Sequence, residues 1–302
     1  MQRIEFRAMG CRMLAVIDGE GEQISAILQQ VPAWFEEWEQ VLSRFRLHSE
    51  LSQLNADAGF WIPLSDTLWS VLTAAIDAAR WSGGVVSPTL LDAVRATGYT
   101  RDFAAGPDTA VAPVPDPQPS AWTQIELDPI HRAVRLPEGL HIDLGGIAKG
   151  WAADEAVRRL AMYGPTLVDA GGDIAASRPM ADGQPWLIGI ENPLNPDAPL
   201  GMLLLAKGGV ATSGRDYRRW QVADGWRHHI IDPRSGQPAQ TIALTATAVA
   251  PSAREAEVAA KLLFILGERG LSQIANWPGH TGMLLCEDGR QLTGRDWETY
   301  LA

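Results

Sequence analysis

The sequence is poor in cysteine, with Cys11 and Cys286 as its two examples in 302 residues. Two cysteines so far apart form neither a metal-binding spacing nor a disulfide framework. We therefore expect both to be reduced thiols that fill partly buried positions.

Long apolar runs are also absent. No stretch approaches the ~18 consecutive apolar residues that a membrane-spanning helix needs. The first seven residues, MQRIEFR, lack the apolar core of a signal peptide. We therefore expect no membrane span and a cytoplasmic location.

Positive charge is scarce, since the formal net charge at pH 7 is -11. Nonspecific binding to nucleic acid or to an anionic membrane surface requires a basic surface, so we expect neither partner. Any site for an anion must be local.

Periodicity predicts a mixture of helices and hairpins. Helical spacing over residues 22–44 is interrupted at Pro32, Ser65 caps a helix that Gly83-Gly84 ends, and a capping box at residues 252–255 begins the last helix. Alternation and turn residues predict strands at 4–18, 125–127, 133–136, 166–168, 186–190 and 202–205, with a further hairpin around Asp224-Gly225.

Helices and hairpins without regular βα alternation indicate an α+β fold. Residues 104–120 are rich in proline and read as an irregular surface loop. The hairpin that follows leads directly into a glycine motif, so we place no boundary there and expect a single domain over residues 1–302.

That glycine motif, residues 143–154 (DLGGIAKGWAAD), matches neither common nucleotide fingerprint, because it lacks G-x-G-x-x-G and has Trp151 where a P-loop needs another residue. A strand-like lead-in at residues 140–144 meets a glycine pair and then an amphipathic helix. Free backbone N–H groups and Lys149 are thereby offered to an anion. From these residues alone, a tight turn with a solvated lysine is the commoner explanation, and a phosphate site is the alternative.

Other short motifs follow one another along the chain: Met9-Gly10, Ser43–Arg46, Ser49–Ser52, Leu54-Asn55, Gly83-Gly84, Pro88-Thr89, Gly171–Asp173, Ala211–Gly214, His229–Gly236 and Leu262–Gly267. With the glycine motif they resemble, in order, the ApbE family of FAD:protein FMN transferases over about residues 5–285. The resemblance implies an ApbE-like α+β fold of largely antiparallel sheets with packed helices. It also implies FAD as the substrate and transfer of FMN, through a phosphoester bond, to a Thr or Ser of a partner flavoprotein.

The resemblance further implies a set of FAD-binding residues: Met9, Phe45, Val85, Val86, Ser87, Asp143 and Lys149. The family usually has tyrosine at position 45 and Ala-Phe-Asp at 85–87, so a hydroxyl, a ring and a carboxylate are missing here. From the residues alone, the Asp143 carboxylate either accepts hydrogen bonds from a flavin or caps amides of the turn. The resemblance favours the flavin.

The densest positive region of this acidic chain is residues 215–234. From the residues alone, a solvated hairpin face with aspartate partners is the commoner explanation. The resemblance implies that His229 accepts the proton of the attacking hydroxyl, with a structural imidazole as the alternative. A hydrolase triad of Ser213, His229 and Asp232 lacks the G-x-S-x-G elbow around the serine.

The last predicted helix departs from the family at the metal site. There the resemblance implies Mg²⁺ held by an aspartate, by a threonine four residues later and by the backbone carbonyl of Gly146. This chain has Glu257 and Lys261 instead. Glutamate can ligate Mg²⁺, but lysine offers only donors and would set a cation where the metal sits. From the residues alone, one explanation is a surface i, i+4 ion pair worth about 0.2–0.5 kcal/mol. The alternative is a partly buried lysine with a purpose, because Ala260 and Phe264 share that helix face.

Two hypotheses follow. The first is an FMN transferase with His229 as base and Mg²⁺ at Gly146 and Glu257. The second is an FAD-binding protein without transferase activity, in which Lys261 replaces the metal.

Overall fold

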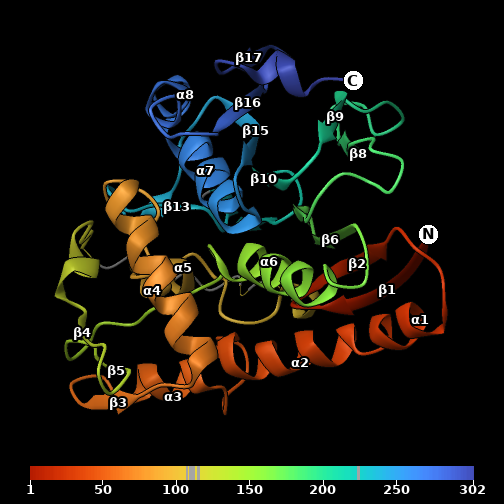
Figure 1. Cartoon of the computed structure of the whole chain (residues 1–302). Helices are drawn as coiled ribbons and strands as arrows, with labels where there is room; N and C mark the ends of the chain where they lie inside the picture. Colours follow the sequence, from red (N-terminus) through yellow and green to blue (C-terminus); the bar gives the residue numbers. More distant parts are fainter. Residues whose placement is uncertain (107, 109–112, 114–115, 223–224) are drawn as a thin grey trace. The chain divides into compact units, whose positions relative to one another are not determined.

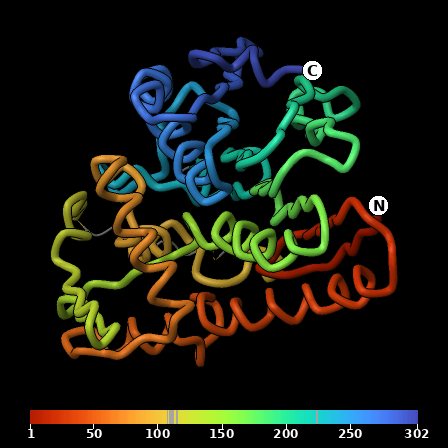
Figure 2. Tube along the Cα trace, viewed as in Figure 1, coloured from red at the N-terminus to blue at the C-terminus, as the bar shows by residue number. Residues whose placement is uncertain are grey.

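The computed structural model describes residues 1–106, 108, 113, 116–222 and 225–302 (Figure 1). The chain divides into two compact units. The first unit consists of Met1–Phe35, Lys149–Asp216 and Thr241–Ala302, and the second of Glu36–Ala148 and Tyr217–Gln240. In the Cα trace, the red, green and blue segments of the first unit come from distant parts of the sequence (Figure 2). The single domain expected for residues 1–302 stays a prediction.

An antiparallel sheet of eight strands organises the first unit. Its strands in spatial order are β1 (Gln2–Ala8), β2 (Cys11–Ile17), β6 (Thr166–Ala170), β7 (Asp173–Ala176), β10 (Gly208–Gly214), β15 (Ala243–Ala250), β16 (Thr281–Cys286) and β17 (Gln291–Thr293). Among the described residues, the strand pairs are antiparallel throughout. Together with the packed helices, this confirms the predicted α+β class.

The single strand predicted over residues 4–18 is instead a hairpin. Ala8 pairs with Cys11, which leaves Met9 and Gly10 as a two-residue turn. Their φ values are 48° and 69°, and a turn with positive φ at both central residues matches the right-handed twist of the flanking strands. The alternation of apolar and polar residues predicts strand structure here correctly, but it does not reveal the turn at Met9-Gly10.

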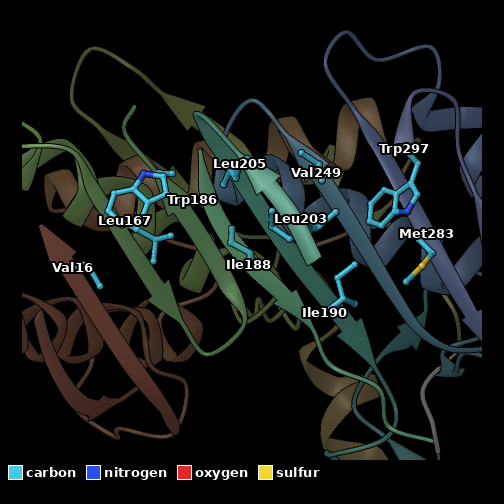
Figure 3. Packing of buried hydrophobic residues seen from close by; sticks show 12 residues of the cluster. Val16, Leu167, Trp186, Ile188, Ile190, Leu203, Leu205, Val249, Met283 and Trp297 are labelled. Carbon is cyan, nitrogen blue, oxygen red and sulfur yellow. The ribbon is translucent and has the colours of Figure 1, made fainter. Parts of the chain in front are cut away.

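A small antiparallel sheet of β8 (Trp186–Ile190) and β9 (Gly201–Leu205) covers one face of the large sheet. Figure 3 shows the core between them, to which β8 and β9 contribute alternate side chains. Its labelled members are Val16, Leu167, Trp186, Ile188, Ile190, Leu203, Leu205, Val249, Met283 and Trp297. These apolar side chains supply the burial that stabilises this half of the unit.

Helix α7 (Ala253–Leu266) lies alongside β10 and β15 (Figure 1). Ser252 accepts a hydrogen bond from the Glu255 N–H at 3.3 Å, which confirms the predicted N-terminal cap. Val210 belongs to the core against β8 and β9, so the neighbouring Gly209 faces the other side of the sheet. A Cβ on Gly209 would overlap the backbone of Ala253, so glycine allows α7 to approach β10 this closely.

The other helices of the first unit are α1 (Glu22–Leu28), α8 (Glu268–Ile274) and α6 (Ala148–Leu160), which begins at the last residue of the second unit. The helical pattern over residues 22–44 divides into α1 and α2 (Val31–Leu42), with Pro32 in the first turn of α2. Proline is tolerated in a first turn because its missing N–H has no intrahelical partner there. The predicted restart at Pro32 is therefore confirmed.

The second unit is built from short elements. They are α3 (Glu50–Ala56), α4 (Asp66–Trp81), α5 (Leu91–Ala96), the three-stranded sheet β3 (Trp61–Pro63), β5 (Ala133–Arg135) and β4 (Glu126–Asp128), and the hairpins β11 (Arg219–Val222) with β12 (Gly225–His228) and β13 (Ile231–Asp232) with β14 (Gln237–Pro238). Ser65 accepts from the Leu68 N–H, as its predicted role as N-cap of α4 requires. Asp224 and parts of the predicted loop at 104–120 lie outside the described residues.

Within the part of the chain that the structure describes, none of the helices combines the length and the apolarity needed to cross a membrane.

We expect Gly209→Ala to destabilise the protein by about 1–3 kcal/mol, because the added methyl group meets backbone rather than a side chain that can move aside. Gly189→Ala is the matched control. Gly189 also lies in a strand, but its Cβ would stand at an ordinary 3.6 Å from the Met202 sulfur. Denaturant unfolding of both variants tests this, and equal midpoints would contradict the close approach of α7.

Candidate functional site

Four charged side chains meet inside the first unit: Lys149, Asp173, Glu257 and Lys261. The Lys149 ammonium donates to Asp173 Oδ2 and lies 3.7 Å from Glu257 Oε1. The Lys261 ammonium donates to the same Glu257 Oε1 at 2.9 Å. These four residues are called the lysine–carboxylate cluster below.

Glu257 reaches the cluster because α6 and α7 approach each other closely. A Cβ on Gly150 would stand 2.7 Å from the Arg254 Cα, so only glycine fits at that position. The Gly150 N–H thereby donates to Glu257 Oε2 at 2.9 Å. One turn further along α6, Asp154 accepts from the N–H groups of Ala253 and Arg254 at 2.8 and 3.0 Å, and so caps α7.

Burial and charge oppose each other in the cluster. The Glu257 and Asp173 side chains are 0% and 2% exposed. Burial acts to raise the pKa of Glu257, but the ammonium groups of Lys261 and Lys149 outweigh it and lower that pKa. Burial, together with the charge of Glu257, raises the pKa of Asp173 to about 6. Burial acts to lower the pKa of Lys149, but the two carboxylates raise it above its ordinary value.

The fit of this cluster to Mg²⁺ is poor. Both carboxylate oxygens of Glu257 are engaged, one by two ammonium groups and the other by a backbone N–H. A divalent cation on Glu257 would have to displace Lys261. Gly146 belongs to the second unit, so its pairing with Glu257 stays a prediction. Among the described residues, no three His, Cys, Asp or Glu side chains are grouped to hold a metal ion.

The second unit has a buried arginine, Arg44, that joins several of the residues expected to bind flavin. Its guanidinium lies 4.1 Å from the ring centroid of Phe45 and 4.6 Å from that of Tyr99. Nη1 donates to the Tyr99 carbonyl at 2.9 Å, and Nε lies 3.5 Å from Asp143 Oδ2. Burial lowers the pKa of Arg44, and the Asp143 carboxylate opposes this shift. Arg44 thus connects Phe45 with Asp143.

Tyr99 extends this cluster to His229. Its ring centroid lies 5.5 Å from that of Phe45, 5.8 Å from that of Trp220 and 6.3 Å from that of His229. Burial raises the pKa of the Tyr99 hydroxyl. The structure therefore brings together three residues that the sequence analysis selected from distant segments: Phe45, Asp143 and His229. We refer to this group, with Arg44 and Tyr99, as the Arg44 cluster.

Sequence reasoning missed Arg44 and Tyr99 as site residues. Arg44 lies within the Ser43–Arg46 motif, so the resemblance could have found it. Tyr99 lies in no motif that carried the resemblance. A ring position of this kind depends on which segments pack together, and no local spacing reveals it.

Asp143 both caps the glycine turn and faces Arg44. Its Oδ1 accepts from the Gly145 N–H at 3.0 Å. The predicted strand-like lead-in at 140–144 is not a strand. It is held instead by a neighbouring side chain and a loop carbonyl: Asn55 donates to and accepts from the Ile142 backbone, and the Asp143 N–H donates to the Pro88 carbonyl. The predicted strand is wrong, because the hydrogen-bond partners of this segment are a side chain and a loop carbonyl rather than a neighbouring strand.

The remaining predicted flavin ligands lie in turns and loops. Met9 belongs to the first unit, in the strained β1–β2 turn. Val86 is buried and its N–H donates to Ser82 Oγ, while Ser87 Oγ lies 2.9 Å from Thr89 Oγ1 and Val85 is half-buried. Their roles toward FAD stay predictions.

In the arginine-rich segment, Arg234 donates to both oxygens of Asp232 at 2.6–3.1 Å. This confirms Asp232 as one of the aspartate partners expected for a solvated hairpin face. Ser213 lies on β10 in the first unit.

We expect Asp143→Ala to lower the free energy of unfolding by about 1–3 kcal/mol without any ligand, because Arg44, whose side chain is 5% exposed, loses its charged partner. Asp143→Asn keeps an oxygen for the Gly145 N–H and should lose less. Denaturant unfolding of the ligand-free variants measures both. An alanine variant as stable as the wild type would show that Asp143 does not support Arg44.

The ApbE family model matches residues 9–285. A curated relative, the FAD:protein FMN transferase of Treponema pallidum, is 31% identical over 93% of this chain and 82% of its own length. The protein of the same name from Salmonella typhimurium is 27% identical over 95% of this chain and 85% of its own length.

Solved structures share the fold. The ApbE protein of Thermotoga maritima superposes with a TM-score of 0.87 at 23% identity, over 100% of this chain and 99% of the other. The flavinyl transferase ApbE of Pseudomonas stutzeri gives a TM-score of 0.81 at 23% identity, over 99% of this chain and 96% of the other.

Proposed function

The chain belongs to the ApbE family, and on that premise we propose that it transfers FMN from FAD to a hydroxyl group of a partner protein. The relative from Treponema pallidum that carries the name FAD:protein FMN transferase supports this, since it aligns with 93% of the chain. In this proposal FAD is the substrate, and the acceptor is a Thr or Ser of a flavoprotein. A cytoplasmic location stays a prediction.

One observation carries the proposal: the Arg44 cluster unites residues from three segments that the resemblance assigned separately to flavin binding and catalysis. Phe45 and Tyr99 supply aromatic rings, which suit the flat isoalloxazine ring. Asp143 supplies a carboxylate that can accept hydrogen bonds from flavin N–H groups. Arg44 Nη2 is buried and has no hydrogen-bond partner among the described residues, so it offers a donor to an oxygen of a ligand.

In the proposed reaction, the acceptor hydroxyl oxygen attacks the phosphorus on the FMN side of the FAD pyrophosphate. A new P–O bond forms, the P–O bond to AMP breaks, and AMP leaves with that electron pair. We propose that His229 accepts the hydroxyl proton, because an imidazole with an ordinary pKa of about 6.5 takes up protons near neutral pH. Its ring lies against Tyr99, in the cluster proposed to hold the flavin.

Lys149 is proposed to bind the pyrophosphate. It stands at the start of α6, where the positive end of the helix dipole adds to its ammonium charge. The resemblance also implies Mg²⁺ at Gly146 and Glu257. Because the contacts of Glu257 do not fit a divalent cation, no step of the proposed reaction is assigned to the metal.

The Lys261–Glu257 contact favours a second candidate function, an FAD-binding protein without transferase activity. In that case the lysine–carboxylate cluster holds FAD intact. Mass spectrometry of candidate acceptor flavoproteins, after incubation with this protein and FAD, separates the two functions. Addition of one FMN supports transfer, whereas tight FAD binding without any addition supports the alternative.

We expect the protein to bind FAD more tightly than FMN. The proposed grip on the pyrophosphate and on adenosine uses parts of FAD that FMN lacks. Fluorescence or calorimetric titration with each flavin measures the difference. Equal affinity for the two, or no affinity for FAD, would contradict both candidate functions.

We expect His229→Gln to slow FMN transfer by about 10²–10⁴-fold, the usual contribution of a general base, with little change in FAD affinity. The matched control is His131→Gln, because His131 is 76% exposed and pairs with Asp128 at the surface. Rates of FMN addition to the acceptor, together with FAD titrations, test this. If His229→Gln lowers only FAD affinity, or lowers neither, His229 is not the base.

A further inference from the structure

Lysine is rare in this chain, and two of its three lysines lie in the lysine–carboxylate cluster. The lysines are Lys149, Lys207 and Lys261, and the other basic residues among the 25 Lys and Arg are arginines. Lys207 is exposed in the first unit. The cluster therefore uses two compact ammonium groups in a protein whose positive charge is otherwise carried by planar guanidinium groups. A compact ammonium comes nearer in shape to a metal ion than a guanidinium does.

The charges of the cluster balance without a metal ion. Two ammonium groups face two carboxylates, and Glu257 Oε1 is shared by Lys261 at 2.9 Å and Lys149 at 3.7 Å. The other oxygen of Glu257 already accepts from Gly150. A divalent cation on Glu257 would lie within a few ångströms of both ammonium groups, where repulsion is strong because the site is poorly solvated. The cluster thus disfavours the metal that the family pattern implies.

The outward side of the cluster is cationic. The two carboxylates are buried, whereas Lys149 and Lys261 remain 17% and 16% exposed. A ligand that approaches from solvent meets ammonium groups before it meets carboxylates. The buried carboxylates hold the two ammonium groups by ion pairs, and an ammonium that is partly exposed can bind an anion such as a phosphate group.

We propose that the Lys261 ammonium takes the place of a divalent cation, so that this cluster excludes Mg²⁺ and binds the diphosphate of FAD with lysine charge alone. The identity of the anion rests on the proposed function. The exclusion of divalent cations rests only on the four side chains. A fixed ammonium cannot coordinate two phosphate oxygens as Mg²⁺ does. We therefore expect that a lysine in place of the metal supports binding of FAD more than it speeds phosphoryl transfer.

The first experiment uses the scarcity of lysine. Protein labelled with ¹³C at the lysine ε-carbons has three side-chain NMR signals to follow, and a single substitution at each position assigns them. During titration of the wild-type protein with Mg²⁺, we expect the Lys149 and Lys261 signals to stay unshifted. A saturable shift of both, with Lys207 unmoved, would overturn the proposal. This measurement requires no flavin and no variant beyond those for assignment.

The second experiment removes the Lys261 ammonium from the cluster. Lys261→Thr removes one ammonium from Glu257 Oε1, so we expect Mn²⁺, followed by electron paramagnetic resonance, to bind about tenfold or more tightly than to the wild type. Lys207→Thr is the control and should bind Mn²⁺ as the wild type does. Unchanged Mn²⁺ affinity in folded Lys261→Thr would overturn the proposal. If that variant does not fold, the Mg²⁺ titration of the wild type decides.

FAD titrations in excess EDTA and in excess Mg²⁺ complete the test. We expect the same FAD affinity for the wild type in both. Absence of FAD binding would defeat the proposed function, while the Mg²⁺ titration would still decide on cation exclusion. FMN transfer that requires Mg²⁺, with shifted lysine signals, would leave the proposed function standing and overturn this inference.

Discussion

The close approach of α6 to α7 determines the chemistry of the first unit. Gly150 removes the side chain that would otherwise separate the two helices, and its N–H then reaches the Glu257 carboxylate. Because that contact draws Glu257 completely out of solvent, the carboxylate must be paired. Lys261 and Lys149 supply the pairing, and Lys149 in turn binds Asp173. The glycine at position 150 is therefore one requirement of the lysine–carboxylate cluster.

The close contact between α6 and α7 also explains how the start of α7 is stabilised. Its first N–H groups have no partners within the helix, and Asp154 of α6 accepts from two of them. Burial raises the pKa of Asp154 to about 6, although the two backbone N–H groups that it accepts from act to lower it. The segment 143–154 therefore contributes Lys149 to the cluster and also positions the helix that contributes Glu257.

In the second unit, a buried arginine, Arg44, joins residues from separate segments. Arg44 stacks on Phe45 and Tyr99 and pairs with Asp143, so a single cation joins an aromatic surface to the glycine turn. The resemblance implies that a hydroxyl is missing at position 45 and that a ring and a carboxylate are missing at positions 85–87. Tyr99 places both a ring and a hydroxyl beside Phe45. The Arg44 cluster therefore has an aromatic surface that includes a residue outside the set that the resemblance implies.

The sequence by itself determined the fold class and most element positions, and it selected Phe45, Asp143 and His229, which the structure brings together. Periodicity, caps and turn residues located α4, α7 and the β4–β5 hairpin, because these signals act between residues that are close in sequence. They failed where backbone partners come from elsewhere. The lead-in to Asp143 is not a strand, because Asn55 and the Pro88 carbonyl provide its hydrogen-bond partners.

Only the tertiary structure decided how the charged residues are paired. From sequence, Glu257 and Lys261 were either a surface ion pair at helical spacing or a partly buried pair at the metal position, and Asp173 had no assigned role. Folding buries both carboxylates and adds Lys149 from another helix, which changes a weak exposed pair into a closed arrangement of four charges. The physical reason is that burial and ion pairing here depend on contacts between α6 and α7, such as that of Gly150 with Glu257, and no local pattern records contacts between residues so far apart in the sequence.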